Sequence, residues 1–209
     1  MNNSAQIGIL CVDDHPLFLE GIATAISSQD DMRLVGVASS GRDAIEQFRK
    51  TRPDITLMDL RLPDMNGIAA MGAIRAEFPH ARIIILTNYE GDVEIQRALA
   101  GGARAYLIKS TPHAEFVDVI RKVERGRTHL PTQVAQNLVE HVDKDVLSER
   151  EVEVLKQVAA GSRNKDIGAR LAISEDSVKS HLRHILEKLN AKDRTEAVAI
   201  GLRRGIIHL

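Results

Sequence analysis

Short apolar runs alternate with helical patterns over the first 130 residues. Runs such as the one from Ile83 to Leu86 are continuously apolar, which is typical of strands buried on both faces of a parallel sheet. A stretch with helical spacing of apolar positions follows each run. The pattern predicts strands over 7–12, 33–39, 55–60, 82–87 and 105–109, and helices over 16–26, 41–50, 66–78, 93–100 and 112–123.

This order of elements predicts an α/β fold, a doubly wound five-stranded parallel sheet with helices on both faces. In such folds, ligands bind at the carboxyl ends of the strands, near the point where the strand order reverses. The polar residues at those ends are therefore the first candidates for a functional site.

From Pro131 onward the strand pattern stops and only helical patterns follow. Residues 131–142 predict one more helix, and the charged stretch 142–145 predicts a linker. Helical patterns at 148–161, 164–173, 174–190 and 194–205 then indicate a small, separate all-α domain. Ser148, with Glu151 three residues later, predicts a capping box at its first helix, and Gly161 is placed to end that helix.

Charge and composition narrow the function classes. The net charge is only −1, but residues 161–209 contain 10 Lys and Arg against 6 Asp and Glu. A basic region favours a polyanionic partner, although an excess of this size is also common on solvated surfaces. Aromatic residues make up 3% of the chain, which argues against a surface that stacks the bases of single-stranded nucleic acid.

Two further features bear on location and redox chemistry. No apolar run approaches the roughly 20 residues of a membrane span, and the N-terminus lacks the pattern of a secretory signal. We therefore expect a cytoplasmic protein with no membrane partner. The single cysteine, Cys11, lies in an apolar run and is expected to be buried and inert.

Five polar residues directly follow or end predicted strands: Asp13, Asp14, Asp59, Thr87 and Lys109. Parallel strands bring these ends to one edge of the sheet, where three carboxylates repel one another unless they are protonated or bind a hard cation. The sequence predicts a Mg²⁺ site at this edge. The ammonium and hydroxyl groups could meet an incoming phosphoryl group there, and a carboxylate could act as the nucleophile.

The first 125 residues or so resemble the receiver domain of two-component response regulators, which has a flavodoxin-like fold. The motifs that carry the resemblance occur in the family's order: Asp13-Asp14, MDLRLPDMNG around Asp59, Thr87, and AYLIK with Lys109.

The resemblance implies that Asp59 accepts a phosphoryl group from a cognate histidine kinase. It implies that Asp14 and Asp59 bind Mg²⁺ directly, that Asp13 binds it through water, and that Arg61 offers its backbone carbonyl.

The resemblance also implies a switch. Lys109 would pair with the phosphoryl group, and Thr87 would move toward that group. The space vacated by Thr87 would let Tyr106 turn inward and change the adjoining surface.

The C-terminal pattern has the layout of a helix-turn-helix. Ser174 predicts the start of a helix on which Lys179 and Arg183 lie one turn apart, opposite an apolar stripe. Such a helix would enter the DNA major groove, whereas the alternative is an ordinary solvated amphipathic helix. The candidate DNA contacts are Lys179, Ser180, His181, Arg183, Lys188, Asn164 and Arg194.

The segment from LSEREVEV to RTEAV resembles the LuxR-type DNA-binding domain over nearly its whole length. The resemblance implies a four-helix module in which residues 174–189 read promoter DNA. It also implies that the last helix, 195–204, pairs with a second copy of the chain.

Together these features predict a response regulator of the NarL/LuxR class that forms a homodimer when phosphorylated and is not an enzyme beyond slow self-dephosphorylation. We expect a receiver domain at 1–127, a helix and linker at 128–146, and the DNA-binding domain at 147–209. One alternative is an aspartyl phosphatase, which usually needs a second acid where Arg61 stands. Another is a DNA-binding protein that acts without phosphorylation.

Overall fold

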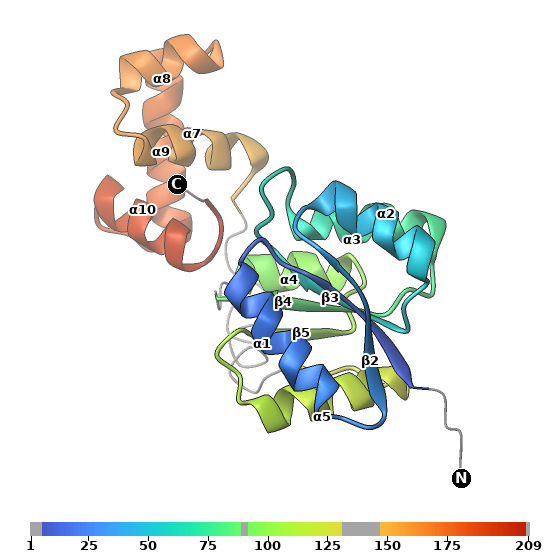
Figure 1. The fold of residues 1–209 in the computed structure, drawn as a ribbon. Coiled ribbons are helices and arrows are strands. Elements are labelled where there is room, and N and C mark those ends of the chain that lie inside the picture. The colour runs from blue at the N-terminus through green and yellow to red at the C-terminus, as the bar shows by residue number, and fades with distance from the viewer. Residues whose placement is uncertain (1–5, 89–91, 131–146, 208–209) are drawn as a thin grey trace. The chain divides into compact units, whose positions relative to one another are not determined.

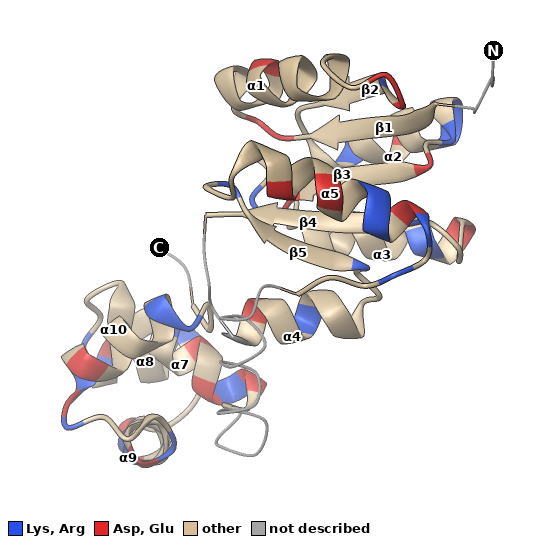
Figure 2. Ribbon diagram, turned by 90° about the horizontal axis from the view of Figure 1, so that it is seen from below, with Lys and Arg blue, Asp and Glu red and all other residues tan. Residues whose placement is uncertain are grey.

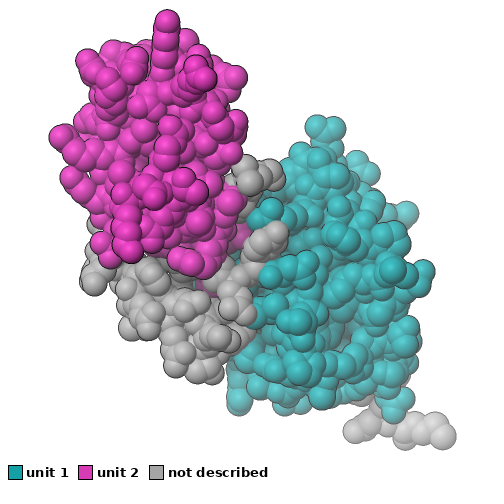
Figure 3. All heavy atoms as spheres, turned by 90° about the vertical axis from the view of Figure 1, so that its left-hand side faces the viewer, with its two compact units in different colours: residues 1–88, 96–132 teal, residues 89–95, 133–209 magenta. Residues whose placement is uncertain are grey.

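The computed structural model of the protein describes residues 6–88, 92–130 and 147–207 (Figure 1). The chain divides into two compact units: residues 1–88 with 96–132, and residues 89–95 with 133–209 (Figure 3). The predicted helix at 131–142 and the predicted linker at 142–145 lie outside the described residues. Among the residues described, no helix is long and apolar enough to cross a membrane.

The first unit is built on a five-stranded parallel sheet, which confirms the predicted fold class. The strand order is β2-β1-β3-β4-β5, and every neighbouring pair is parallel. The central strands are almost wholly buried, which explains their continuous apolar runs. The strands are β1 (Ile7–Val12), β2 (Met32–Ala38), β3 (Ile55–Asp59), β4 (Ile83–Thr87) and β5 (Ala105–Ile108).

A helix follows each strand: α1 (Pro16–Ser27), α2 (Gly41–Thr51), α3 (Gly67–Glu77), α4 (Asp92–Ala100) and α5 (His113–Glu124). One core cluster joins Ile22 of α1 and Phe116 of α5 to strand residues that include Ile9 and Cys11. Helices α2 and α3 pack together on the opposite face of the sheet (Figure 1). Burial raises the pKa of the Cys11 thiol to about 12, so this thiol is inert at neutral pH.

The strand order reverses between β1 and β3, so a crevice is expected at the carboxyl ends of these two strands. The start of α3 fits closely against the end of β3. The Gly67 N–H donates to the Leu60 carbonyl at 2.8 Å, and a Cβ at Gly67 would lie 2.0 Å from the Asp59 carbonyl oxygen. Only glycine allows this approach, which fixes the loop after Asp59.

The second unit contains α7 (Glu149–Ala159), α8 (Asn164–Leu171), α9 (Glu175–Leu189) and α10 (Arg194–Arg203). Its core includes Val154, Ile167, Val178 and Ile185, one or more from each of α7, α8 and α9. The described part of this unit contains no strand, as the sequence pattern predicted.

Three predicted helix limits of the second unit are confirmed. Ser148 and Glu151 form a reciprocal capping box, in which the Glu151 carboxylate accepts from the Ser148 N–H at 2.7 Å. Gly161 follows α7 with a φ of 77°, a conformation that glycine adopts without strain. Ser174 caps α9 by accepting a hydrogen bond from the Ser177 N–H at 3.0 Å.

Candidate functional site

The carboxyl ends of β1 and β3 bring an acidic cluster together. Asp13 is fully buried and Asp59 is 3% exposed, whereas Asp14 and His15 lie at the surface. One potential ligand atom from each of these four residues lies within 4.8 Å of the others. The strand ends therefore place three carboxylates and one imidazole around a single point.

Lys109 reaches the same point from the end of β5. Its Nζ lies 2.6 Å from Asp13 Oδ2 and 2.9 Å from Asp59 Oδ2. The Lys109 N–H donates to the Thr87 carbonyl at 2.7 Å, which fixes the end of β5 against the end of β4. One ammonium is thus shared between two buried carboxylates.

Burial and charge act in opposite directions on this pair. Burial raises the pKa of Asp59 above its usual value, against the lowering effect of Lys109 and of the Arg61 N–H. Burial lowers the pKa of Lys109, but its hydrogen bonds to Asp13 and Asp59 outweigh this effect and the pKa is raised. Lys109 therefore stays cationic, beside a poorly solvated carboxylate that is suited to nucleophilic attack.

The donor set fits a hard divalent cation. Three carboxyl groups meet beside the single ammonium of Lys109, and carboxylates gathered in this way repel one another unless a cation such as a dication offsets their charge. Carboxylate oxygens are preferred ligands of Mg²⁺. His15 adds an imidazole, with Nδ1 at 2.7 Å from Asp14 Oδ1 and 3.0 Å from Asp13 Oδ1.

The two candidate switch residues are both buried. Thr87 is 1% exposed and ends β4, one residue beyond Leu86, which pairs with Asp59 in the sheet. Tyr106 lies in β5 and is fully buried. This is the inward position that the switch hypothesis assigns to the phosphorylated state.

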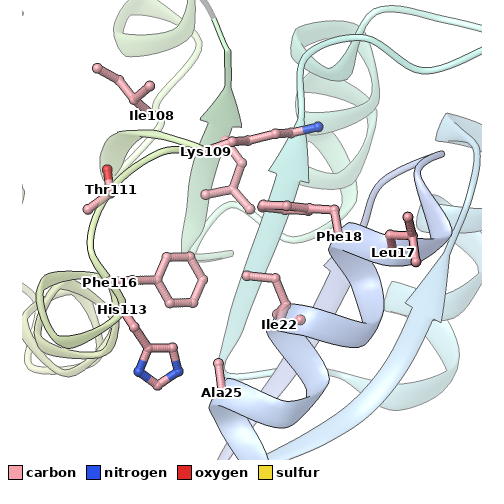
Figure 4. Close-up of a pocket in the computed structure, with 11 residues that line it drawn as sticks. Leu17, Phe18, Ile22, Ala25, Ile108, Lys109, Thr111, His113 and Phe116 are labelled. Atoms are coloured by element: carbon pink, nitrogen blue, oxygen red, sulfur yellow. The ribbon is translucent and has the colours of Figure 1, made fainter.

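A cavity of 260 Å³ lies between α1 and α5, next to Lys109 (Figure 4). Ile22 and Ala25 line it from α1, and Phe116 lines it from α5. Phe18 and Lys109 form the part of its wall that lies toward the acidic cluster. The site thus has a polar side, with the carboxylates, and an apolar side.

In the second unit, the apolar stripe of α9 packs into the core through Val178 and Ile185, and the opposite face is exposed. Lys179 and Arg183 are exposed on α9. Figure 2 marks the charged residues of the two units by colour. The Lys179 Nζ lies 3.1 Å from Asp176 Oδ1, an exposed contact that contributes little stability. Two neighbours on the same helix, Ser180 and His181, are half-buried.

Of the other three predicted DNA contacts, two bind other parts of the unit and the third lies at the start of α8. Lys188 Nζ lies 2.8 Å from Oε2 of the buried Glu151 on α7. Arg194 Nη2 donates to the Ser162 carbonyl at 3.0 Å. Asn164 is half-buried at the start of α8, and its Oδ1 accepts no hydrogen bond from the part of the chain that the structure describes.

Sequence reasoning did not select two residues that the structure places at the acidic cluster. His15 was detectable, because it directly follows the Asp13-Asp14 pair. Phe18 was not, because its spacing is that of an ordinary core position on α1. Nothing in the linear pattern connects it with Lys109.

Comparison with known proteins identifies both parts of the chain. Residues 9–121 match the response regulator receiver domain, and residues 145–200 match the luxR family of bacterial regulatory proteins.

Similar proteins match over the whole chain. An uncharacterized transcriptional regulatory protein, YxjL from Bacillus subtilis, is 37% identical over 98% of this chain and 99% of its own length. The response regulator VraR from Staphylococcus epidermidis is 34% identical over 96% of this chain and 99% of its own.

Solved structures give the same result. The response regulator ChrA of a heme-sensing two-component system is 32% identical, with a TM-score of 0.58 over 97% of this chain and 100% of its own. A LuxR-family response regulator from Aurantimonas sp. SI85-9A1 is 35% identical, with a TM-score of 0.63 over 66% of this chain and 99% of its own. The chain therefore belongs to the two-component response regulators that join a receiver domain to a LuxR-type DNA-binding domain, a family of transcription regulators and not of enzymes.

Proposed function

We propose that Asp59 accepts a phosphoryl group from a cognate histidine kinase, and that this modification controls sequence-specific binding of the second unit to promoter DNA. The observation that carries the proposal is the environment of Asp59. Its carboxylate is 3% exposed, lies 2.9 Å from the Lys109 ammonium, and shares the end of the sheet with two further carboxylates. The cytoplasm, where promoter DNA is present, is then the place of action.

In the transfer, a carboxylate oxygen of Asp59 attacks the phosphorus of a phosphohistidine. The P–N bond breaks, the imidazole leaves, and an acyl phosphate remains on Asp59. Lys109 changes partner from the Asp59 carboxylate to a phosphoryl oxygen and stabilises its charge. A Mg²⁺ ion held by Asp14 and Asp59, by Asp13 through water and by the Arg61 carbonyl would neutralise further charge on the phosphoryl oxygens.

The new dianionic group then acts on the sheet. The Thr87 hydroxyl donates to a phosphoryl oxygen, and this arrangement favours the buried position of Tyr106. Thr87 ends β4 and Tyr106 lies in β5, so a small shift at Asp59 reaches the β4–β5 edge of the receiver. We place this receiver at residues 1–127, followed by a helix and linker at 128–146.

The DNA-binding module at 147–209 places α9 in the major groove of double-stranded promoter DNA. Lys179, Ser180 and Arg183 face the bases and phosphates there, and a homodimer formed on phosphorylation presents two such helices. The flanking contacts are assigned to His181, Lys188, Asn164 and Arg194, of which Lys188 and Arg194 also stabilise the unit.

The proposal is tested by phosphorylating the full chain with acetyl phosphate and Mg²⁺ and measuring the intact mass. We expect one phosphoryl group on the unchanged protein and none on Asp59→Asn, because the amide cannot form an acyl phosphate. Asp118→Asn, which changes an exposed carboxylate on α5, is the matched control and should be labelled normally. Labelling of Asp59→Asn at another residue would exclude Asp59 as the acceptor.

A further inference from the structure

An aromatic ring lies against the ammonium of Lys109. Phe18, on the first turns of α1, places its ring centroid 4.8 Å from Lys109 Nζ. Figure 4 shows Phe18 reaching from α1 toward the Lys109 side chain. This distance is within the roughly 6 Å over which a cation is attracted by the negative face of a ring.

The ring and the two carboxylates hold the ammonium together. Asp59 Oδ2 accepts a hydrogen bond from Nζ, Asp13 Oδ2 forms an ion pair with it at 2.6 Å, and the Lys109 side chain is only 8% exposed. The Phe18 ring therefore takes a position that water would otherwise occupy. A cation–π contact of a desolvated cation is stronger than one at an exposed site.

Phe18 and Lys109 both lie in the wall of the cavity between α1 and α5. The other walls of this 260 Å³ space include Ile22 and Phe116. A smaller side chain at position 18 would join the cavity to the acidic cluster. The flexible lysine stem could then move away from the carboxylates, toward open space.

The backbone fixes the ring relative to the cluster. The His15 N–H donates to Asp13 Oδ1 at 2.9 Å, and the Phe18 N–H donates to the His15 carbonyl at 3.1 Å. One short segment thus supplies a buried carboxylate and the aromatic ring. The spacing of this carboxylate and this ring is set within the segment and does not depend on Lys109, which comes from the end of β5.

We propose that Phe18 is the positioning residue for Lys109 in phosphoryl transfer. Its ring holds the ammonium in place while Lys109 exchanges the Asp59 carboxylate for a phosphoryl oxygen. The ring contact is made to the methylene-flanked ammonium and not to the acceptor oxygen, so it is retained through this exchange. The inference rests on the proposed phosphorylation of Asp59.

Fluorinated phenylalanines test the contact, because each ring fluorine weakens the negative face and leaves the shape nearly unchanged. The full chain carries a ring with one, two or three fluorines at position 18, and phosphorylation by acetyl phosphate with Mg²⁺ is timed. We expect the rate to fall with each added fluorine, by about tenfold in total at three fluorines, because the cation–π contact with Lys109 is lost. Phe18→Tyr should keep the rate, and Phe18→Leu should lose it.

A second readout does not depend on the reaction. Hydrogen exchange of the Lys109 ammonium, followed by NMR at one fixed pH, should become faster along the same series, because the ammonium becomes more hydrated. The matched control is the same series at Phe116, which lines the cavity from α5, and both readouts should stay unchanged there.

The outcomes separate the two proposals. The role of Phe18 would be overturned if the unsubstituted chain is phosphorylated normally and the rate stays constant along the fluorine series at Phe18. An equal loss of rate along the series at Phe116 would overturn it too. Asp59 would remain the acceptor in both cases. Absence of phosphorylation in the unsubstituted chain would overturn the proposed function. The exchange measurement would still decide in that case whether Phe18 shields Lys109.

Discussion

At Asp59, burial and the ion pair with Lys109 act in opposite directions on the carboxyl pKa, and burial has the larger effect. A raised pKa means that the folded receiver holds the ionised carboxylate less favourably than water does. A buried, ionised carboxylate of this kind lowers the free energy of unfolding. Proteins often retain such residues because their function requires them.

We expect Asp59→Asn to be more stable than the unchanged protein at neutral pH without divalent cations, by about 0.5–2 kcal/mol. The raised pKa makes the folded state bind more protons than the unfolded chain between the ordinary carboxyl pKa of 3.8 and the folded value. The free energy of unfolding therefore falls as pH rises through this window. The uncharged amide of Asp59→Asn does not lose stability in this way. The difference in free energy of unfolding between the variant and the unchanged protein should therefore shrink as pH falls toward 3.8.

Calorimetry in EDTA at several pH values measures this difference and resolves the transitions of the two units. Asp118→Asn is the contrasting control, because its hydrogen bond with Lys122 lowers the pKa of Asp118. That exposed residue should show no gain in stability. If Asp59→Asn unfolds more easily than the unchanged protein at neutral pH, the Lys109 ion pair stabilises the folded state more than the burial of Asp59 destabilises it, contrary to this prediction.

Single residues differ in how much of their role could be predicted from the sequence. Asp13 and Asp59 were found because each directly follows or ends a buried strand, and parallel strands share one edge. The ion pair of Lys188 with Glu151 could not be predicted, because it joins α9 to α7 and depends on how these helices pack. For the same reason, helical spacing marked Phe18 as apolar but did not place its ring beside Lys109.

Among the elements, α9 is the one to which we assign DNA recognition. Val178 and Ile185 of its apolar stripe pack into the core, so substitutions on the opposite face should not disturb that core. We expect Lys179→Ala or Arg183→Ala to weaken binding to a selected operator by about 1–3 kcal/mol if the side chain reads a base. A phosphate contact would instead reduce the salt dependence of binding.

Titration of labelled operator duplexes at several salt concentrations distinguishes these two roles. Lys156→Ala, on the exposed surface of α7, is the matched control and should leave binding unchanged. Lys188→Ala should mainly lower stability, since it leaves the buried Glu151 carboxylate without this ion pair. Unchanged affinity and sequence preference in both α9 variants would exclude this face as the recognition surface.

The start of a helix could be predicted from the sequence wherever a capping residue marks it. Ser148 and Ser174 each satisfy backbone N–H groups at a helix start, so α7 and α9 begin where the capping residues stand. The last helix begins at Arg194, where the helical pattern starts and one residue before the start implied by the resemblance, because Asp193 caps it through the Thr195 and Glu196 N–H groups. Strand order, in contrast, depends on long-range pairing that no local pattern contains.

At the scale of the whole molecule, the proposed phosphorylation would change DNA binding through the number of recognition helices that the protein presents. One C-terminal unit presents one α9, which spans one half-site. Two copies joined by their receivers present two, and the second half-site is then bound at a high effective concentration. Dimerisation would therefore raise operator affinity without any new contact to a base.

We expect the full chain with Mg²⁺ and beryllofluoride, which mimics the phosphoryl group, to double its mass in light scattering. Asp59→Asn should keep the mass of one chain, since its site cannot bind the mimic in the same way. An operator with two half-sites should then bind the dimer about a hundredfold more tightly than one half-site does, and the variant should show a much smaller difference. A treated protein that occupies two-site DNA as a monomer, with affinity equal to that of Asp59→Asn, would mean that phosphorylation acts by some route other than pairing.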